Sequence, residues 1–200
     1  MNEFAEWDSF YLIVGGAAGA LIGLQFVVMT LITQRGGTGV APPEIGKAFS
    51  TPTVVHFTAV LFLAALARAP WQTITPAAII GGLIGAAGVV YVVRIHLLIR
   101  KQDRYEPVFE DWFFHCLLPL AAYLSLMVLA LTSSITTRVS FFGTAAATLA
   151  LLLTGIHNAW DAVTWHVFSM PAASSSAARD TGPAPSDEVA ASGVESAESE

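Results

Sequence analysis

The stretch YLIVGGAAGALIGLQFVVMTLI, residues 11–32, decides the class of this protein. It contains no charged side chain, and an α-helix needs about 20 mostly apolar residues to cross the hydrocarbon core of a bilayer. No Lys or Arg precedes it, whereas a cleaved secretory signal begins with a positively charged region. We therefore interpret the stretch as a retained transmembrane helix and expect an integral membrane protein.

The composition of the whole chain supports the same class. Hydrophobic residues make up 54% of the 200 residues, charged residues make up 12%, and the mean hydropathy is +0.64. In soluble domains charged residues account for about a quarter of the chain. No basic patch indicates a nucleic-acid partner, and the single cysteine, Cys116, excludes an intrachain disulfide framework.

Four more apolar runs of bilayer-spanning length follow the first one. The five expected spans cover about 9–33, 50–69, 76–99, 111–133 and 139–168. Proline tolerates the first turn of a helix, so Pro52 and Pro76 are expected to mark the starts of the second and third spans. The sequence thus predicts an all-α, polytopic membrane helix bundle that forms one transmembrane domain over residues 1–168.

The distribution of basic residues predicts how the bundle is oriented. Cytoplasmic loops are enriched in Lys and Arg, and alternate connections place seven of the nine bases on one side and two, Arg68 and Arg138, on the other. We therefore expect the N-terminus outside and the C-terminus in the cytoplasm, most simply of the plasma membrane. Residues 169–200 are rich in Ser, Ala, Pro and acids, and we expect them to form a disordered acidic cytoplasmic tail.

Small residues form strips along the first and third spans. Glycines recur every four residues at positions 15, 19 and 23, and the third span has small residues at 78, 82 and 86 with a second row at 81 and 85. Such strips let helix backbones approach closely in lipid. We expect them to pack within the bundle, to form a homo-oligomer face or to leave room for a ligand.

Ionisable side chains share a depth in the membrane. With a rise of about 1.5 Å per residue, His56 lies roughly 5–9 Å from the cytoplasmic end of its span, His115 about 6 Å, Asp161 about 10 Å and His157 about 16 Å. Gln25 and His96 fall in the same half. The outer half has essentially no ionisable residue.

Spacing joins some of these residues into pairs. Asp111 and His115 are four residues apart, as are His157 and Asp161, so each pair occupies one helix face. An unpaired carboxylate near the centre of a membrane helix is costly, by roughly 2.5–3.5 kcal/mol on insertion scales. An imidazole, Arg94, a metal ion or water would relieve that cost.

The residue types favour a transition-metal site, for example for zinc. Imidazole and carboxylate ligands suit zinc, iron or copper, and helix bundles build metal sites from facing helices. The candidate ligands are His56, His115 and His157, with Asp161 as a ligand, an orienting group or a catalytic proton carrier; Asp111 and His166 are weaker candidates because both fall at expected helix ends. A metal there could activate water, which would make the protein hydrolytic.

The candidate set is similar, in single residues, to the membrane hydrolases of the alkaline ceramidase and adiponectin receptor group. In that group three histidines from different helices bind zinc beside a carboxylate and a serine. This chain departs from the group in having five expected helices instead of seven, and no serine stands at the required position before His56. The resemblance covers residues and not a shared motif, so it does not place the chain in the group.

Three other functions stay open at the level of sequence. Two histidines on facing helices could bind haem b axially. A His and Asp face could relay protons in a proton-coupled carrier. The polar cluster could also only fix helix register in a non-enzymatic structural or assembly protein. The chain contains no Walker loop, HExxH, CxxC or GxSxG motif that would decide whether it is an enzyme.

Overall fold

The computed structural model describes residues 3–34, 43–99, 112–133, 135 and 137–168. These residues are almost entirely helical and contain no strand. The elements are α1 (Glu3–Glu6), α2 (Asp8–Gln34), α3 (Pro43–Arg68), α4 (Ile74–Ile99), the π-helix η1 (Phe113–Leu117), α6 (Leu118–Thr132) and α7 (Thr137–Phe168).

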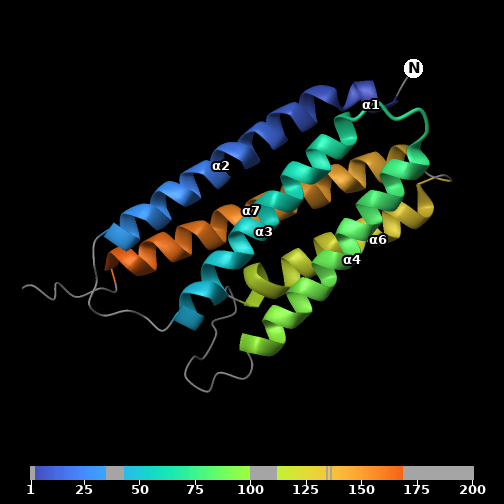
Figure 1. Cartoon of the computed structure of the whole chain (residues 1–200). Helices are drawn as coiled ribbons and strands as arrows, with labels where there is room; N and C mark the ends of the chain where they lie inside the picture. Colours follow the sequence, from blue (N-terminus) through green and yellow to red (C-terminus); the bar gives the residue numbers. More distant parts are fainter. Residues whose placement is uncertain (1–2, 35–42, 100–111, 134, 136, 169–200) are drawn as a thin grey trace, which may run out of the picture.

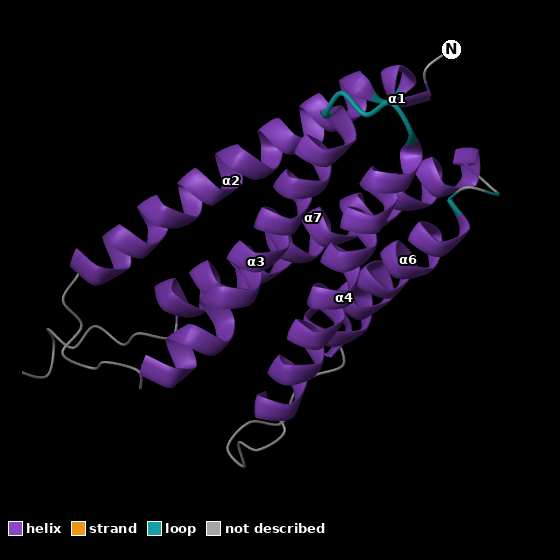
Figure 2. Ribbon diagram, turned by 45° about the vertical axis from the view of Figure 1, so that its right-hand side comes forward, coloured by secondary structure: helices purple, strands orange, loops and turns teal. Residues whose placement is uncertain are grey.

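The long helices form one bundle (Figure 1). Helix α2 packs against α3, α3 also packs against α7, and α6 packs against both α7 and α4. Helices α2 and α4 therefore lie on opposite sides, with α3 and α7 between them (Figure 2). The C-terminal ends of α2, α4 and α7 lie at the same end of the bundle as the N-termini of α3 and η1, which is the end predicted to face the cytoplasm (Figure 1).

The prediction of five membrane spans is confirmed. Within the described residues, five helical segments are long and apolar enough to cross a membrane: Asp8–Thr30, Thr51–Arg68, Ile74–Leu97, Phe113–Thr132 and Thr137–Thr164. The chain is therefore a multi-pass membrane helix bundle. The predicted orientation stays a prediction, and residues 169–200, where the tail was expected, lie outside the described residues.

The second span begins at Thr51, beside Pro52 as predicted, but the helix that carries it begins earlier than predicted. Helix α3 begins at Pro43 and continues through Pro52, which lies inside it. Transmembrane helices tolerate an internal proline because neighbouring helices and side chains can satisfy the freed carbonyl. Pro76, by contrast, lies in the first turn of α4, close to the expected start.

Apolar side chains face outward and polar ones face inward. Large hydrophobic residues lie exposed on the outside of every span, for example Ile13 (71%), Phe62 (62%), Leu83 (64%) and Leu131 (82%). The buried residues include eight polar or charged ones: Gln25, Thr53, His56, Ser133, Ser140, Thr148, Thr154 and Asn158. A soluble protein would not present such an apolar surface to water, whereas lipid covers it without penalty.

Aromatic and ionic contacts tie the helices together at the end predicted to lie outside. The Trp7 ring packs edge-on against Phe10 and Phe142 and is stacked on Phe141 at 6.2 Å, which joins the start of α2 to α7. Arg68 at the end of α3 forms an ion pair with Asp8 at 3.0 Å. These contacts fix the starts of α2 and α7 beside the end of α3.

The small-residue strips differ in what covers them. On α4, a Cβ at Gly82 would lie 2.8 Å from Ala130 Cβ, and one at Gly85 would lie 2.8 Å from the Tyr123 carbonyl oxygen, so α6 covers this strip. On α2, Gly15 packs against Ala64 of α3, while such a Cβ on Gly19 has no described atom within 4 Å. The close-packing interpretation thus holds for α4 and for Gly15, and a homo-oligomer contact through the open part of α2 stays a prediction.

Candidate polar site in the membrane interior

His56 lies at the centre of the bundle and is tied to α6. Its side chain is 1% exposed, and its Nδ1 lies 3.0 Å from the hydroxyl of Tyr123, which is equally buried. The two residues are 67 positions apart in the chain, so the hydrogen bond joins α3 to α6. Because both groups are polar and shielded from water and lipid, each needs a hydrogen-bond partner, and each supplies one to the other.

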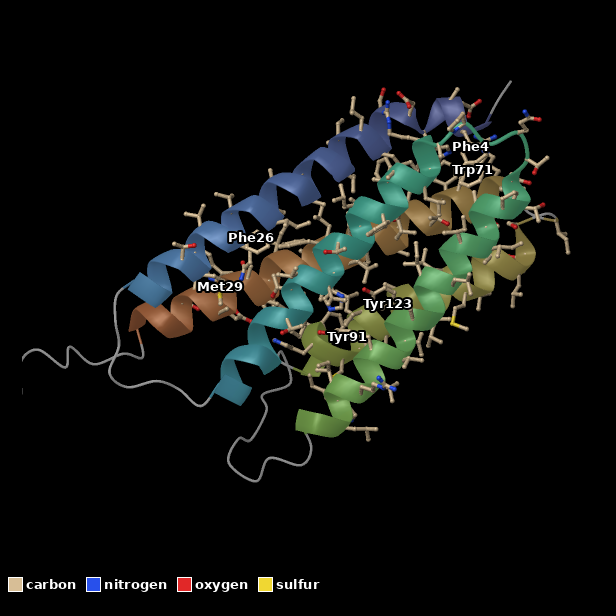
Figure 3. All side chains as sticks on the ribbon, in the orientation of Figure 1. Phe4, Phe26, Met29, Trp71, Tyr91 and Tyr123 are labelled. Atoms are coloured by element: carbon tan, nitrogen blue, oxygen red, sulfur yellow. The ribbon has the colours of Figure 1, made fainter. Side chains whose placement is uncertain are left out.

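The Tyr123 ring is held in place by a glycine of α4. A Cβ on Gly88 would lie 2.2–2.4 Å from three carbons of that ring, so the ring lies directly on the α4 backbone. Tyr91, one turn further along α4, approaches His56 edge-on at 6.4 Å between ring centroids. Figure 3 shows Tyr91 and Tyr123 in the middle of the bundle, where α3, α4 and α6 meet, whereas Phe4 and Trp71 lie at the predicted outer end. The hydroxyl of Tyr91 is buried and has no hydrogen-bond partner among the described residues.

The π-helix η1 brings a second set of side chains to this region. Its five residues precede α6 without a break, and π-helical turns inside helices occur often at functional sites. Phe114 of η1 stacks on the ring of His157 at 3.7 Å, and His115 lies within electrostatic range of His56. Thus η1 lies near two predicted site histidines, His56 on α3 and His157 on α7.

His157 and Asp161 form the predicted pair on α7. Their Nε2 and Oδ2 atoms lie 3.0 Å apart, and the side chains are 19% and 40% exposed. The distance satisfies an ion pair, yet His157 Nε2 makes no hydrogen bond of acceptable geometry within the part of the chain that the structure describes. We regard the two groups as neighbours in contact and not as a directed hydrogen bond, because angle as well as distance determines its strength.

The candidate ligands are not gathered around one point. No group of three or more His, Cys, Asp or Glu side chains within the described part of the chain could hold a metal ion. Asp111 lies outside that part, and for His166 only the helical backbone of α7 is described. The geometry therefore gives the metal prediction no support.

A cavity of about 70 Å³ lies elsewhere, towards the predicted outer end. Its walls are mostly apolar and include Tyr11, Leu63, Ala77, Leu126 and Phe141. None of the predicted site residues whose side chains the structure describes lines it.

Sequence reasoning missed the partners of the histidines. Tyr123, Tyr91 and Phe114 lie in apolar runs, where they resemble ordinary lipid-facing or core aromatics. A tyrosine in the middle of a membrane span was the available signal, because a buried hydroxyl needs a partner. His96 Nδ1 also lies 3.3 Å from Cys116 Sγ, which joins α4 to η1.

Comparison with known proteins adds no relative: no protein-family model, no curated protein and no solved structure matches the chain.

Proposed function

We propose that this chain is a non-enzymatic multi-pass membrane protein of the structural or assembly kind, in which buried histidines hold the helices in register. The observation that supports this is the way the histidines are paired. His56 contacts Tyr123, His157 contacts Phe114, and His96 contacts Cys116. Each contact joins a different pair of elements: α3 with α6, α7 with η1, and α4 with η1.

This pattern suits a structural role because a membrane bundle lacks the usual driving force for packing. Lipid tails are as apolar as leucine, so helix association depends on close packing and on polar contacts between helices. A histidine tied to one side chain on a neighbouring helix specifies which helices meet and at what height. The three contacts described here supply that information for four of the long segments.

Metal analysis tests the proposal directly. We expect protein purified in detergent to contain substoichiometric transition metal, to lack the visible absorption of haem, and to melt at the same temperature with and without a chelator. Loss of one of these histidine contacts should still destabilise the protein. His157→Ala should therefore lower the melting temperature by about 2–4 °C, the shift that a loss of about 1 kcal/mol of unfolding free energy produces in a chain of this size. Arg138→Ala, an exposed residue at the opposite end of α7, is the matched control and should leave it unchanged.

A transition metal such as zinc, with hydrolytic chemistry, is the second candidate. The feature that favours it is η1, because a π-helical turn places His115 near His56 while its neighbour Phe114 lies on His157. Stoichiometric metal that is lost in His56→Ala, His115→Ala and His157→Ala, together with a melting temperature that falls on chelation, would establish this candidate and refute the structural one.

We also propose the plasma membrane as the location, with the N-terminus outside. The excess of bases in alternate connections supports this orientation. We expect a reporter enzyme that is active only after export to be inactive when fused after Glu200 and active when inserted between α3 and α4. The reverse activity pattern would invert the orientation.

A further inference from the structure

Four side chains within the described residues have an enclosed polar atom without a hydrogen-bond partner, and Thr53 and Asn158 are the two most deeply buried of them. Thr53 is 0% exposed and Asn158 is 2% exposed. The Oγ1 atom of Thr53 and both the Oδ1 and the Nδ2 atoms of Asn158 are enclosed and unpartnered. Buried polar groups in native proteins are almost always paired, so an unpartnered group indicates an unseen ligand, water or ion.

The packing of α3 on α7 places these two residues at the same height. A Cβ on Gly155 would lie 2.4 Å from the Phe57 ring, so these positions face each other across the interface. Thr53 lies four residues before Phe57, and Asn158 lies three residues after Gly155. Because α3 and α7 run in opposite directions, both residues lie about one turn from that contact, roughly 4.5–6 Å further towards the predicted cytoplasmic end.

The same helix faces carry both residues into the interior. On α3, Thr53 belongs to a stripe with Phe57, Val60 and Ala64, all at most 2% exposed. On α7, Asn158 continues a stripe with Thr154 and Leu151, which are both 0% exposed. The hydroxyl of Thr154 donates to the carbonyl oxygen of Ala150 and so has no need of a ligand, unlike the amide of Asn158.

A third polar residue from α2 lies at a similar height. Gly15 contacts Ala64, and counting from this contact, Gln25 and Thr53 lie about 15 Å and 16.5 Å away in the same direction. Gln25 is 6% exposed. Three helices therefore contribute a neutral polar side chain to one level of the bundle.

The unpartnered atoms define the chemistry of the ligand. Asn158 offers an acceptor and a donor side by side, and the Thr53 hydroxyl can act as either. Water can donate to Oδ1 or Oγ1 and accept from Nδ2, whereas a cation bound at the oxygens would leave the Nδ2 donor without an acceptor. Buried water usually makes about three hydrogen bonds, the number that these three atoms provide.

We propose that Thr53 and Asn158 hold an internal water molecule between α3 and α7. The water satisfies polar groups that the protein itself leaves unpaired and joins the two helices one turn from the Phe57–Gly155 contact. This site is separate from the histidine contacts described above, and it consists of neutral side chains only.

Selective isotope labelling can detect the water, because the chain contains two asparagines, Asn2 and Asn158. In protein labelled with ¹⁵N-asparagine and held in deuterated detergent micelles, we expect a dipolar cross-peak between the Asn158 side-chain amide and water. Asn158→Leu identifies the signal by its loss. An Asn158 amide without any cross-peak to water overturns the proposal.

Melting of two variants gives an independent test. Thr53→Val keeps the shape but removes the hydroxyl, and Asn158→Leu removes the amide. With water bound, each variant should lower the melting temperature by about 2–4 °C. Thr148→Val is the matched control, since the buried Thr148 hydroxyl donates to the Thr144 carbonyl oxygen of its own helix. This substitution should change the melting temperature little.

If Thr53→Val and Asn158→Leu raise the melting temperature, the site is empty and the proposal is wrong. If both lower it while the Asn158 amide has no contact with water, a different ligand occupies the site and water is refuted.

Discussion

Gly88→Ala should destabilise the bundle by about 1–3 kcal/mol, the range measured when extra carbon is forced into a packed interior. The new Cβ would lie 2.2–2.4 Å from three carbons of the Tyr123 ring. The ring is 1% exposed and its hydroxyl is bonded to His56, so it cannot move aside without disturbing that contact. The free energy of unfolding, measured by titrating the protein from mild detergent into SDS, reports the loss.

Gly81→Ala provides the control on the same helix. A Cβ at Gly81 would meet its nearest neighbour, Leu66 Cδ2, at 3.9 Å, which is ordinary van der Waals contact. Both substitutions add one methyl group to α4 and remove the flexibility of glycine, so they differ mainly in the clash with Tyr123. Equal stability of the two variants would mean that the ring does not lie on Gly88.

The membrane spans could be predicted from the sequence because hydropathy and length determine them. The run from residue 11 to 32 needed no tertiary information, and the same is true of the four others. Details that depend on backbone hydrogen bonds could not be predicted. The sequence predicts a start at Pro52, although α3 passes through it. The π-helix η1 could not be predicted because hydropathy does not report which carbonyl each backbone amide contacts.

The candidate site was predictable within a helix and not between helices. The spacing of four residues predicted that His157 and Asp161 would meet, and they lie 3.0 Å apart. No spacing could reveal that His56 contacts Tyr123, because that contact depends on how α3 and α6 are set against each other. Whether the histidines gather around a metal or each contact a different neighbour also depends on how the helices are set against each other. This explains why the sequence favoured a metal-binding cluster that the described residues do not form.

His56→Ala should produce a large loss of stability. Truncation of a large buried side chain to alanine costs about 2–5 kcal/mol when the cavity does not collapse. Here it also removes the partner of a buried hydroxyl, since His56 Nδ1 lies 3.0 Å from the Tyr123 oxygen. We expect unfolding at markedly lower SDS concentration than for the native chain, again followed by titration from mild detergent.

A double-mutant cycle with Tyr123→Phe separates the hydrogen bond from the cavity. The phenylalanine ring can still lie on Gly88, so this variant loses the hydroxyl alone. Polar contacts between membrane helices contribute about 0.6 kcal/mol on average and up to about 1.7 kcal/mol, and we expect a coupling energy within that range. The sign of the change in unfolding free energy caused by Tyr123→Phe is diagnostic. This substitution should destabilise the native chain. After His56→Ala it should be neutral or stabilising, because the Tyr123 hydroxyl then has no partner to lose. If the losses of unfolding free energy are additive, the two side chains are neighbours without a stabilising hydrogen bond. The contact between α3 and α6 would then be stabilised by apolar packing alone.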